Sequence, residues 1–254
     1  MKNILTFIIL LISIHSSNGQ GLTIIKYLYT TTEGSSVNLI QYLNDEKSLE
    51  ITVPKNKSLR DSIFSYSMDE LGNETSKVYT GSNQRIPFVY KNQRANQLLL
   101  ADNLGMNERI FLTDTLNNFV WSFHHNENKQ IGKFNCTKAT TKFRGRNYIA
   151  WFTKDLKISG GPWKFGGLNG LIVEVIDSDN LFKYELTEVL TKQKMNRDIT
   201  IPEQYEKEKP ITYKDYSLRK KMHKQSIESD NRPILLNGKL LSNVKHKLAI
   251  DQEL

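Results

Sequence analysis

The chain has 254 residues, of which 38% are hydrophobic and 10% aromatic, so it can bury a sizeable core. Its formal net charge is +8, with basic residues spread along the chain and densest in residues 217–224. This spread favours a solvated basic surface, with an anionic phospholipid or polysaccharide surface as the alternative partner. The single cysteine, Cys136, excludes an intramolecular disulfide framework.

The N-terminus has the layout of a secretory signal peptide. Residues 1–3 form a short positive start, residues 4–14 an apolar run, and residues 17–19 a group of small residues. The apolar run is too short to span a bilayer, and no later stretch is long enough to do so. We therefore expect a signal peptide at residues 1–19, a single exported domain at residues 20–254, and no transmembrane segment. An exported chain without a recognisable nucleic-acid module is expected to have no nucleic-acid partner.

The first half of the chain is mostly strand-like. Residues 22–30 and 36–43 are rich in β-branched and aromatic side chains, and a Glu-Gly turn signal separates them. The polar segment between residues 55 and 76 is expected to be a short helix or a loop. Shorter strands are expected at residues 48–53, 77–80, 86–91, 96–102 and 109–114.

The second half contains two predicted hairpins and a helix. Residues 132–143 alternate in polarity, turn at Arg144-Gly145 and return along residues 147–153. A second hairpin joins residues 171–177 to residues 181–189. Residues 213–229 carry Leu218 and Met222 at helical spacing and are expected to form a helix. The fold class is thus α+β, mainly β, with a curved, half-barrel-like antiparallel sheet and a C-terminal helix.

Between the hairpins lies the unusual stretch GPWKFGGLNGLI, residues 161–172. Its glycines permit close backbone approach, and its two aromatic residues alternate around a lysine. One interpretation is a tight crossover, clamped by Trp163 and Phe165, that delivers the chain into a buried strand. The alternative is an exposed aromatic patch of Trp151, Trp163 and Phe165 that contacts an apolar ligand or a partner.

The stretches CTKATTKFRGRNYIAWFT (136–153) and GPWKFGGLNGLI (161–172) resemble the GLPGLI family of exported proteins. The matching positions are Cys136, Lys138, Ala139, Phe143, Gly145, Arg146, Ala150, Trp151, Phe152, Thr153 and Gly161 to Phe165. The family's usual proline is replaced here by Asn169, which also tolerates turn geometry. The resemblance implies the periplasm or outer-membrane periphery of a Gram-negative bacterium and carries no established activity.

Few residues suggest chemistry. Cys136 with His124 or His125 could form a nucleophile and base, but a lone strand cysteine is more often a small buried hydrophobe. Adjacent histidines point to opposite faces of a strand, so no metal site and no cofactor are expected. Arg144 and Arg146 flank the hairpin glycine, where they either are solvated or fold back onto a carboxylate or an acidic ligand group.

These observations support two hypotheses. The first is a non-enzymatic periplasmic protein whose concave sheet carries an apolar ligand or holds an envelope component; it fails if the protein's own side chains fill that face. The second is an interaction or assembly factor for an outer-membrane protein. An enzyme is the third possibility and requires a cleft that brings Cys136 or a histidine to an acid. The candidate binding residues are Trp151, Trp163, Phe165, Arg144 and Arg146, and nothing in the sequence indicates the oligomeric state.

Overall fold

The structure is a computed structural model, and it describes most of the chain after residue 20. The described residues are 21–53, 65–68, 74–77, 87–104, 108–116, 119–193, 198–229, 235–236 and 239–240. The expected signal peptide at residues 1–19 lies outside them. Among the described residues, no helix is long and apolar enough to cross a membrane.

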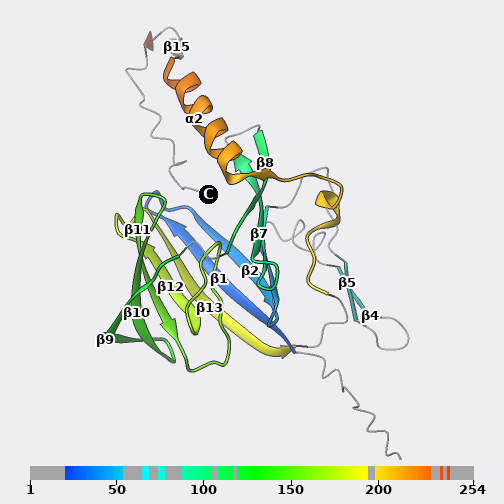
Figure 1. The fold of residues 1–254 in the computed structure, drawn as a ribbon, viewed down its shortest axis with the longest axis vertical. Helices are drawn as coiled ribbons and strands as arrows, with labels where there is room; N and C mark the ends of the chain where they lie inside the picture. Colours follow the sequence, from blue (N-terminus) through cyan, green and yellow to red (C-terminus); the bar gives the residue numbers. More distant parts are fainter. Residues whose placement is uncertain are drawn as a thin grey trace, which may run out of the picture.

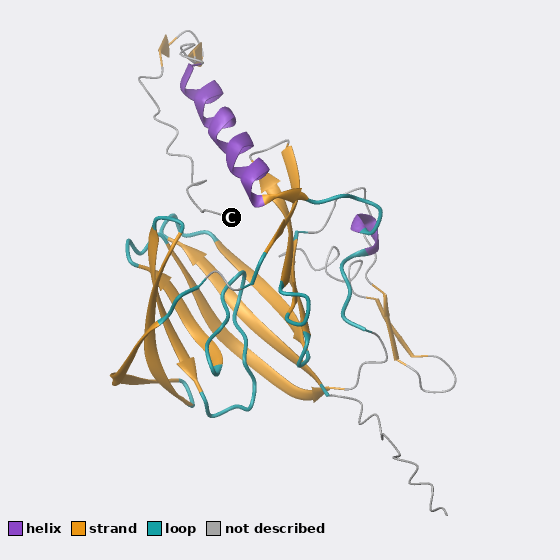
Figure 2. Cartoon of the chain, viewed as in Figure 1, coloured by secondary structure: helices purple, strands orange, loops and turns teal. Residues whose placement is uncertain are grey.

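One large sheet dominates the molecule (Figures 1 and 2). Its described strands follow the order β14-β8-β7-β6-β3-β2-β1-β13-β12-β11-β10-β9, and every neighbouring pair is antiparallel except β14 and β8. The strands are β1 Leu22–Thr31, β2 Ser36–Leu43, β3 Lys47–Val53, β6 Phe88–Asn92, β7 Gln97–Leu104, β8 Glu108–Asp114, β9 Ser122–Ile131, β10 Phe134–Phe143, β11 Arg146–Thr153, β12 Leu171–Asp177, β13 Phe182–Gln193 and β14 Ile211–Thr212.

The remaining elements are small, apart from one helix. The short strands are β4 Ser65–Met68 and β5 Glu74–Lys77, which pair with each other, and β15 Leu235–Leu236 and β16 Lys239–Leu240, which do the same. A 3-10 helix, η1, spans Glu203–Tyr205, and the helix α2 spans Tyr213–Ser229. The prediction of a mainly β protein with an antiparallel sheet and a C-terminal helix is therefore confirmed.

Most predicted strands lie within a few residues of the observed ones, and the exceptions are polar. Strand β9 was not predicted, because its sequence SFHHNENKQI shows no apolar alternation. It lies at the edge of the sheet with mostly exposed side chains, so burial does not select apolar residues there. The segment expected as helix or loop contains β4 and most of β5. The strand predicted at residues 77–80 is described only at Lys77.

The hairpin of β10 and β11 has the predicted turn. Arg144 and Gly145 both adopt positive φ, at 49° and 88°, as in the two-residue turns whose twist matches that of the strands. The pairing then runs from Phe143 opposite Arg146 to Cys136 opposite Thr153. The hairpin of β12 and β13 is also present, with Val175 opposite Tyr184.

The loop between β11 and β12, residues 154–170, crosses the inner face of the curved sheet (Figure 1). The Tyr27 hydroxyl of β1 donates a hydrogen bond of 2.9 Å to the carbonyl of Ile172, and the Gln41 side-chain amide of β2 donates one of 2.9 Å to the carbonyl of Gly161. Phe165 and Leu168 are buried in the core that this face builds. The loop and its buried side chains thus occupy much of the inner face, which the carrier hypothesis required to be open.

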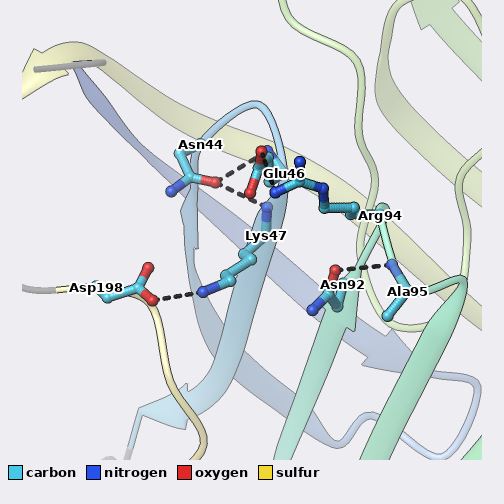
Figure 3. A network of polar contacts seen from close by, with 7 residues as sticks. All are labelled: Asn44, Glu46, Lys47, Asn92, Arg94, Ala95 and Asp198. Carbon is cyan, nitrogen blue, oxygen red and sulfur yellow. Dashed lines mark hydrogen bonds and ion pairs between the residues drawn. The ribbon is translucent and has the colours of Figure 1, made fainter. Parts of the chain in front are cut away.

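Part of the outer face is covered by the segment that follows β13. Ile199 and Tyr205 pack on an apolar cluster from β1, β3, β6, β7 and β8. An ion pair between Lys47 and Asp198 fastens this segment to β3 (Figure 3). In the adjacent turn, Asn44 Oδ1 accepts hydrogen bonds from the backbone N–H groups of Glu46 and Lys47, at 3.0 and 2.7 Å, which sets the approach of β3.

Candidate functional site

Two charged residues on the inner face hold the loop. Lys91 Nζ of β6 donates hydrogen bonds of 2.8 Å to the carbonyls of Gly161 and Phe165. The Glu50 carboxylate of β3 accepts the backbone N–H of Trp163, with N–O distances of 3.0 and 3.1 Å. Both charged side chains are buried, so this clamp joins the loop to the centre of the sheet.

Burial shifts the protonation of both members of the clamp. Burial raises the pKa of Glu50 to about 7, although the charge of Lys91 and the Trp163 N–H act in the opposite direction. Burial likewise lowers the pKa of Lys91 to about 8, against the effect of Glu50. Burial therefore shifts both groups of the clamp toward their uncharged forms.

Trp163 adopts a strained backbone conformation. Its φ is +47°, in the left-handed region that bulky residues rarely occupy. The hydrogen bonds to Glu50 hold this conformation, and the ring packs at 5.2 Å, centroid to centroid, from that of Phe165. Such strain persists only where the surroundings stabilise it, and it concentrates at functional sites and ligand clamps.

The next residue of the loop joins a second charged cluster. Lys164 Nζ lies 3.4 Å from Asp114 Oδ2, and Arg144 Nη2 lies 2.7 Å from the same oxygen. Burial raises the pKa of the Asp114 carboxyl, but these two cations outweigh this effect and hold the pKa below its usual value. The Arg144 guanidinium also lies 3.0 Å from the centroid of the Tyr213 ring, which connects the hairpin and the loop to the start of α2.

A pocket with a volume of about 200 Å³ opens beside Trp163. It lies where β2, β3, β6 and β7 meet the loop and the ends of β1 and β13. Its lining residues are Tyr29, Val37, Leu39, Glu50, Ile51, Thr52, Pro87, Phe88, Val89, Leu100, Ala101, Asp102, Trp163 and Tyr184. Two carboxylates, those of Glu50 and Asp102, therefore line one small cavity together with apolar side chains. Three of its aromatic side chains, those of Tyr29, Trp163 and Tyr184, each carry a polar atom.

The two tyrosines of this pocket remain neutral hydroxyls. Burial, followed by the charge of Asp102, raises the pKa of Tyr29 far above its usual value. Burial also raises the pKa of Tyr184. The Tyr29 hydroxyl oxygen is buried and has no hydrogen-bond partner among the described residues. An unsatisfied buried hydroxyl is uncommon and calls for a partner such as a water molecule or a ligand.

The structure separates the three aromatic residues proposed from the sequence. Trp163 is half-buried and lines the pocket, whereas Phe165 is fully buried in the core behind it. Trp151 packs in a different cluster, with Cys136 and Val173. The three rings therefore do not form one exposed patch, and a binding role for Trp151 or Phe165 stays a prediction.

Both candidate arginines fold back onto carboxylates. Arg144 pairs with Asp114, as described above, and Arg146 Nη1 lies 3.0 Å from Asp177 Oδ2. Asp177 is fully buried, and its other oxygen accepts the backbone N–H of Phe182 at 3.0 Å. These contacts give both arginines a place in the fold, and neither of them lines the pocket.

Cys136 is not placed for nucleophilic chemistry. Burial raises the pKa of its thiol to about 11, so the reactive thiolate is scarce near neutral pH. It lies opposite Lys129 in the sheet, whereas His124 lies opposite Lys138 and contacts the Thr140 hydroxyl at 2.9 Å. Within the described part of the chain, no three His, Cys, Asp or Glu side chains gather in a way that could hold a metal ion.

Sequence reasoning did not identify Tyr29, Glu50, Lys91, Asp102 or Tyr184 as site residues. Glu50 occupies the polar position of an alternating strand, residues 49–53, which the sequence alone assigns to a solvated face, but the structure buries this position inside the sheet. A charge at such a position requires a buried partner. The pocket itself left no local signal, because its lining residues come from distant segments.

Glu50 is expected to make the stability of the fold depend on pH. Because its folded pKa is raised from 4.5 to about 7, the folded state keeps a proton that the unfolded state releases. The stability contributed by Glu50 is thus present below about pH 4.5 and is lost as the pH rises through about 7. Urea unfolding at pH 5, 6 and 7 should show a steeper loss of stability for the wild type than for Glu50→Gln. If the wild type and Glu50→Gln lost the same amount of stability between pH 5 and pH 7, a raised pKa of Glu50 would be contradicted.

Known proteins resemble this chain in sequence and in fold. A family model described as "N-glycanase peptide, N-terminal domain" matches residues 46–215. A solved structure of PNGF-II in space group C2 has 18% sequence identity and a TM-score of 0.50, covering 79% of this chain and 33% of that chain. A second PNGF-II structure, in space group P21, has 18% identity and a TM-score of 0.48, covering 79% and 34%. No curated protein matches the chain.

These matches correct three expectations drawn from the sequence. The resemblance to the GLPGLI family was wrong, because the family that matches is the N-glycanase domain. The hypotheses of a non-enzymatic carrier and of an assembly factor are overturned by the same match. The likeness to PNGF-II shows the fold alone, and the chain spans about a third of the length of these solved structures.

Proposed function

This chain belongs to the N-glycanase N-terminal domain family, and we propose from that membership that it serves in the enzymatic removal of N-linked glycans. The family match carries the proposal, since it covers 170 of the 254 residues. The matched range contains Glu50, Asp102 and Trp163, the charged and strained residues of the pocket.

The chemistry of the pocket supports a hydrolytic role. Enzymes that remove glycans commonly use two carboxyl groups, one to donate a proton to the leaving group and one to assist the attacking group. The raised pKa of Glu50 suits it to proton donation near neutral pH, and Asp102 supplies the second carboxyl. In this proposal a water molecule attacks the linkage between the glycan and the asparagine, Asp102 accepts a proton from that water, and Glu50 donates a proton to the linkage nitrogen as its bond breaks.

The test is glycan release by the purified full chain. A denatured glycoprotein that carries one N-linked glycan is incubated with the protein, and the loss of glycan mass is followed by mass spectrometry. We expect release that falls by about 100-fold or more in Glu50→Gln, the usual contribution of a positioned acid or base. Lys142→Gln, at an exposed position of β10, is the matched control and should keep the wild-type rate. Absence of release by the wild type, while a known N-glycanase acts on the same substrate, would refute the proposal.

A further inference from the structure

The helix α2 is anchored to the sheet at its start and then extends away from it (Figures 1 and 2). Tyr216 is buried and, with the half-buried Tyr213, packs on an apolar cluster from β6, β7 and β8. The Arg144 guanidinium lies over the Tyr213 ring, at 3.0 Å from its centroid. The first turn is thus held by the body of the protein, which fixes the direction in which the rest of the helix points.

Two large apolar side chains lie on the side of α2 that faces away from the sheet. Two positions along an α-helix turn by about 200°, so Leu218 lies opposite the buried Tyr216. Met222 follows one turn later on the same side as Leu218. The exposed fractions of these two residues are 59% and 61%. Leu218 and Met222 therefore form a short apolar stripe that is open to solvent.

Positive charges flank this apolar pair. Lys214 lies one turn before Leu218 and Lys221 three positions after it, so both share its side of the helix, and both are exposed. Asp215 is the acidic residue of this part of the helix, and its carboxylate accepts a hydrogen bond of 2.7 Å from the Thr212 hydroxyl at the helix start. The positive end of the helix dipole stabilises a carboxylate there. The outward side thus combines two apolar side chains with a positive rim.

The charge of α2 selects the partner. Residues 213–222 contain four basic residues and one acidic residue, a net charge of +3, and the whole chain carries +8. A second copy of this chain would bring the same positive side against it, so repulsion would oppose that contact. A stripe two residues long is also far smaller than a stable protein interface. An anionic bilayer has the complementary charge over a wide surface, and its headgroup layer accepts apolar side chains.

We infer that α2 docks on the surface of an anionic phospholipid bilayer, with Leu218 and Met222 inserted among the headgroups and Lys214 and Lys221 on lipid phosphates. The lysine stems lie along the apolar side chains while their ammonium groups reach the phosphates, as is usual at such a surface. The inference goes beyond the proposed function and does not depend on it, because it assigns a membrane-docking role to α2 and uses none of the chemistry of the pocket.

Sedimentation with large lipid vesicles tests this inference. The purified full chain is mixed with vesicles of phosphatidylcholine alone, or of equal parts phosphatidylcholine and phosphatidylglycerol, and the bound fraction is measured at increasing lipid concentration. We expect binding to the anionic vesicles to be tighter by about tenfold or more, since each lysine near such a surface contributes about fivefold. Added salt should weaken this binding, because it screens the charges. Equal binding to both kinds of vesicle, or binding to neither, would overturn the inference.

A pair of charge variants shows whether α2 carries the binding. Lys214→Gln with Lys221→Gln should weaken binding to the anionic vesicles by more than about tenfold. Lys142→Gln with Lys154→Gln removes the same charge at exposed positions outside α2 and should weaken it by less than about threefold, because only the long-range attraction changes. Circular dichroism confirms that both variants are folded. Equal losses in the two variants would reveal a general effect of net charge and refute docking through α2.

The apolar pair separates a bilayer from a soluble polyanion. Leu218→Gln with Met222→Gln keeps the charge and the helix propensity, and should weaken vesicle binding by about tenfold while leaving the binding of dextran sulfate unchanged. Val120→Gln, which replaces an 84% exposed apolar residue outside α2, is the matched control and should bind vesicles as the wild type does. Vesicle binding that survives the double variant unchanged would mean that charge alone attracts the chain, and would overturn the inference.

Discussion

Gly170→Ala is expected to destabilise the fold by more than about 4 kcal/mol, a loss seen only when a substitution meets a severe structural conflict. A Cβ atom at this position would lie 2.3 Å from the carbonyl oxygen of Thr153 and 3.1 Å from the Phe152 ring. The obstacle is backbone of β11, which is paired with β10 and β12 and so cannot move aside. The φ of +156° adds strain for any residue with a side chain.

The same loop offers a matched control. At Gly166 a Cβ atom would meet nothing within 4 Å, so Gly166→Ala should change stability by no more than about 0.5 kcal/mol. Gly161→Ala should lie between the two, since its obstacle is the flexible end of the Ile172 side chain, at 2.6 Å. Urea denaturation monitored by circular dichroism measures all three. A Gly170→Ala protein as stable as Gly166→Ala would show that the close approach of the loop to β11 is wrong.

Lys91→Met is expected to cost about 3–5 kcal/mol, the range found when one partner of a buried charge pair is removed. Its ammonium group donates to the carbonyls of Gly161 and Phe165, and both would lose this donor. The variant also leaves the buried carboxylate of Glu50 without its nearby cation. The loop would then lose half of the clamp that holds it on the sheet.

A double variant tests whether the cost arises from the charge left behind. Lys91→Met with Glu50→Leu removes both buried charges and should be more stable than the sum of the two single variants predicts, because neither charge is then uncompensated. Lys142→Met, at an exposed position of β10, is the control and should stay within about 0.5 kcal/mol of the wild type. Equal losses for Lys91→Met and Lys142→Met would refute the clamp.

The stretch GPWKFGGLNGLI combines the two roles that its sequence left open. Gly170 permits the close approach to β11, and Phe165 is buried in the core, so part of the stretch is a folding device. Trp163 is half-buried and lines the pocket, so another part forms the wall of the candidate site. The motif identified the location of a special structure, but the family inferred from it was wrong.

Periodicity and turn chemistry were enough to predict the local structure. The helix at residues 213–229 and the strands at residues 36–43 and 171–177 were predicted with the observed bounds. The reason is that side-chain alternation, helical spacing and turn residues act over a few neighbouring residues. Strand β9 was missed because an exposed edge strand needs no apolar face.

The sequence by itself therefore determined the fold class and most elements, whereas the tertiary structure alone decided the site. Glu50 meets Trp163 across 113 residues, and Lys91 meets Gly161 across 70. Tyr29 and Asp102 come from β1 and β7, which are separated in the sheet by three other strands. Only the curvature of the sheet and the path of the loop bring these side chains to one pocket, and such long-range placement has no local pattern in a single sequence.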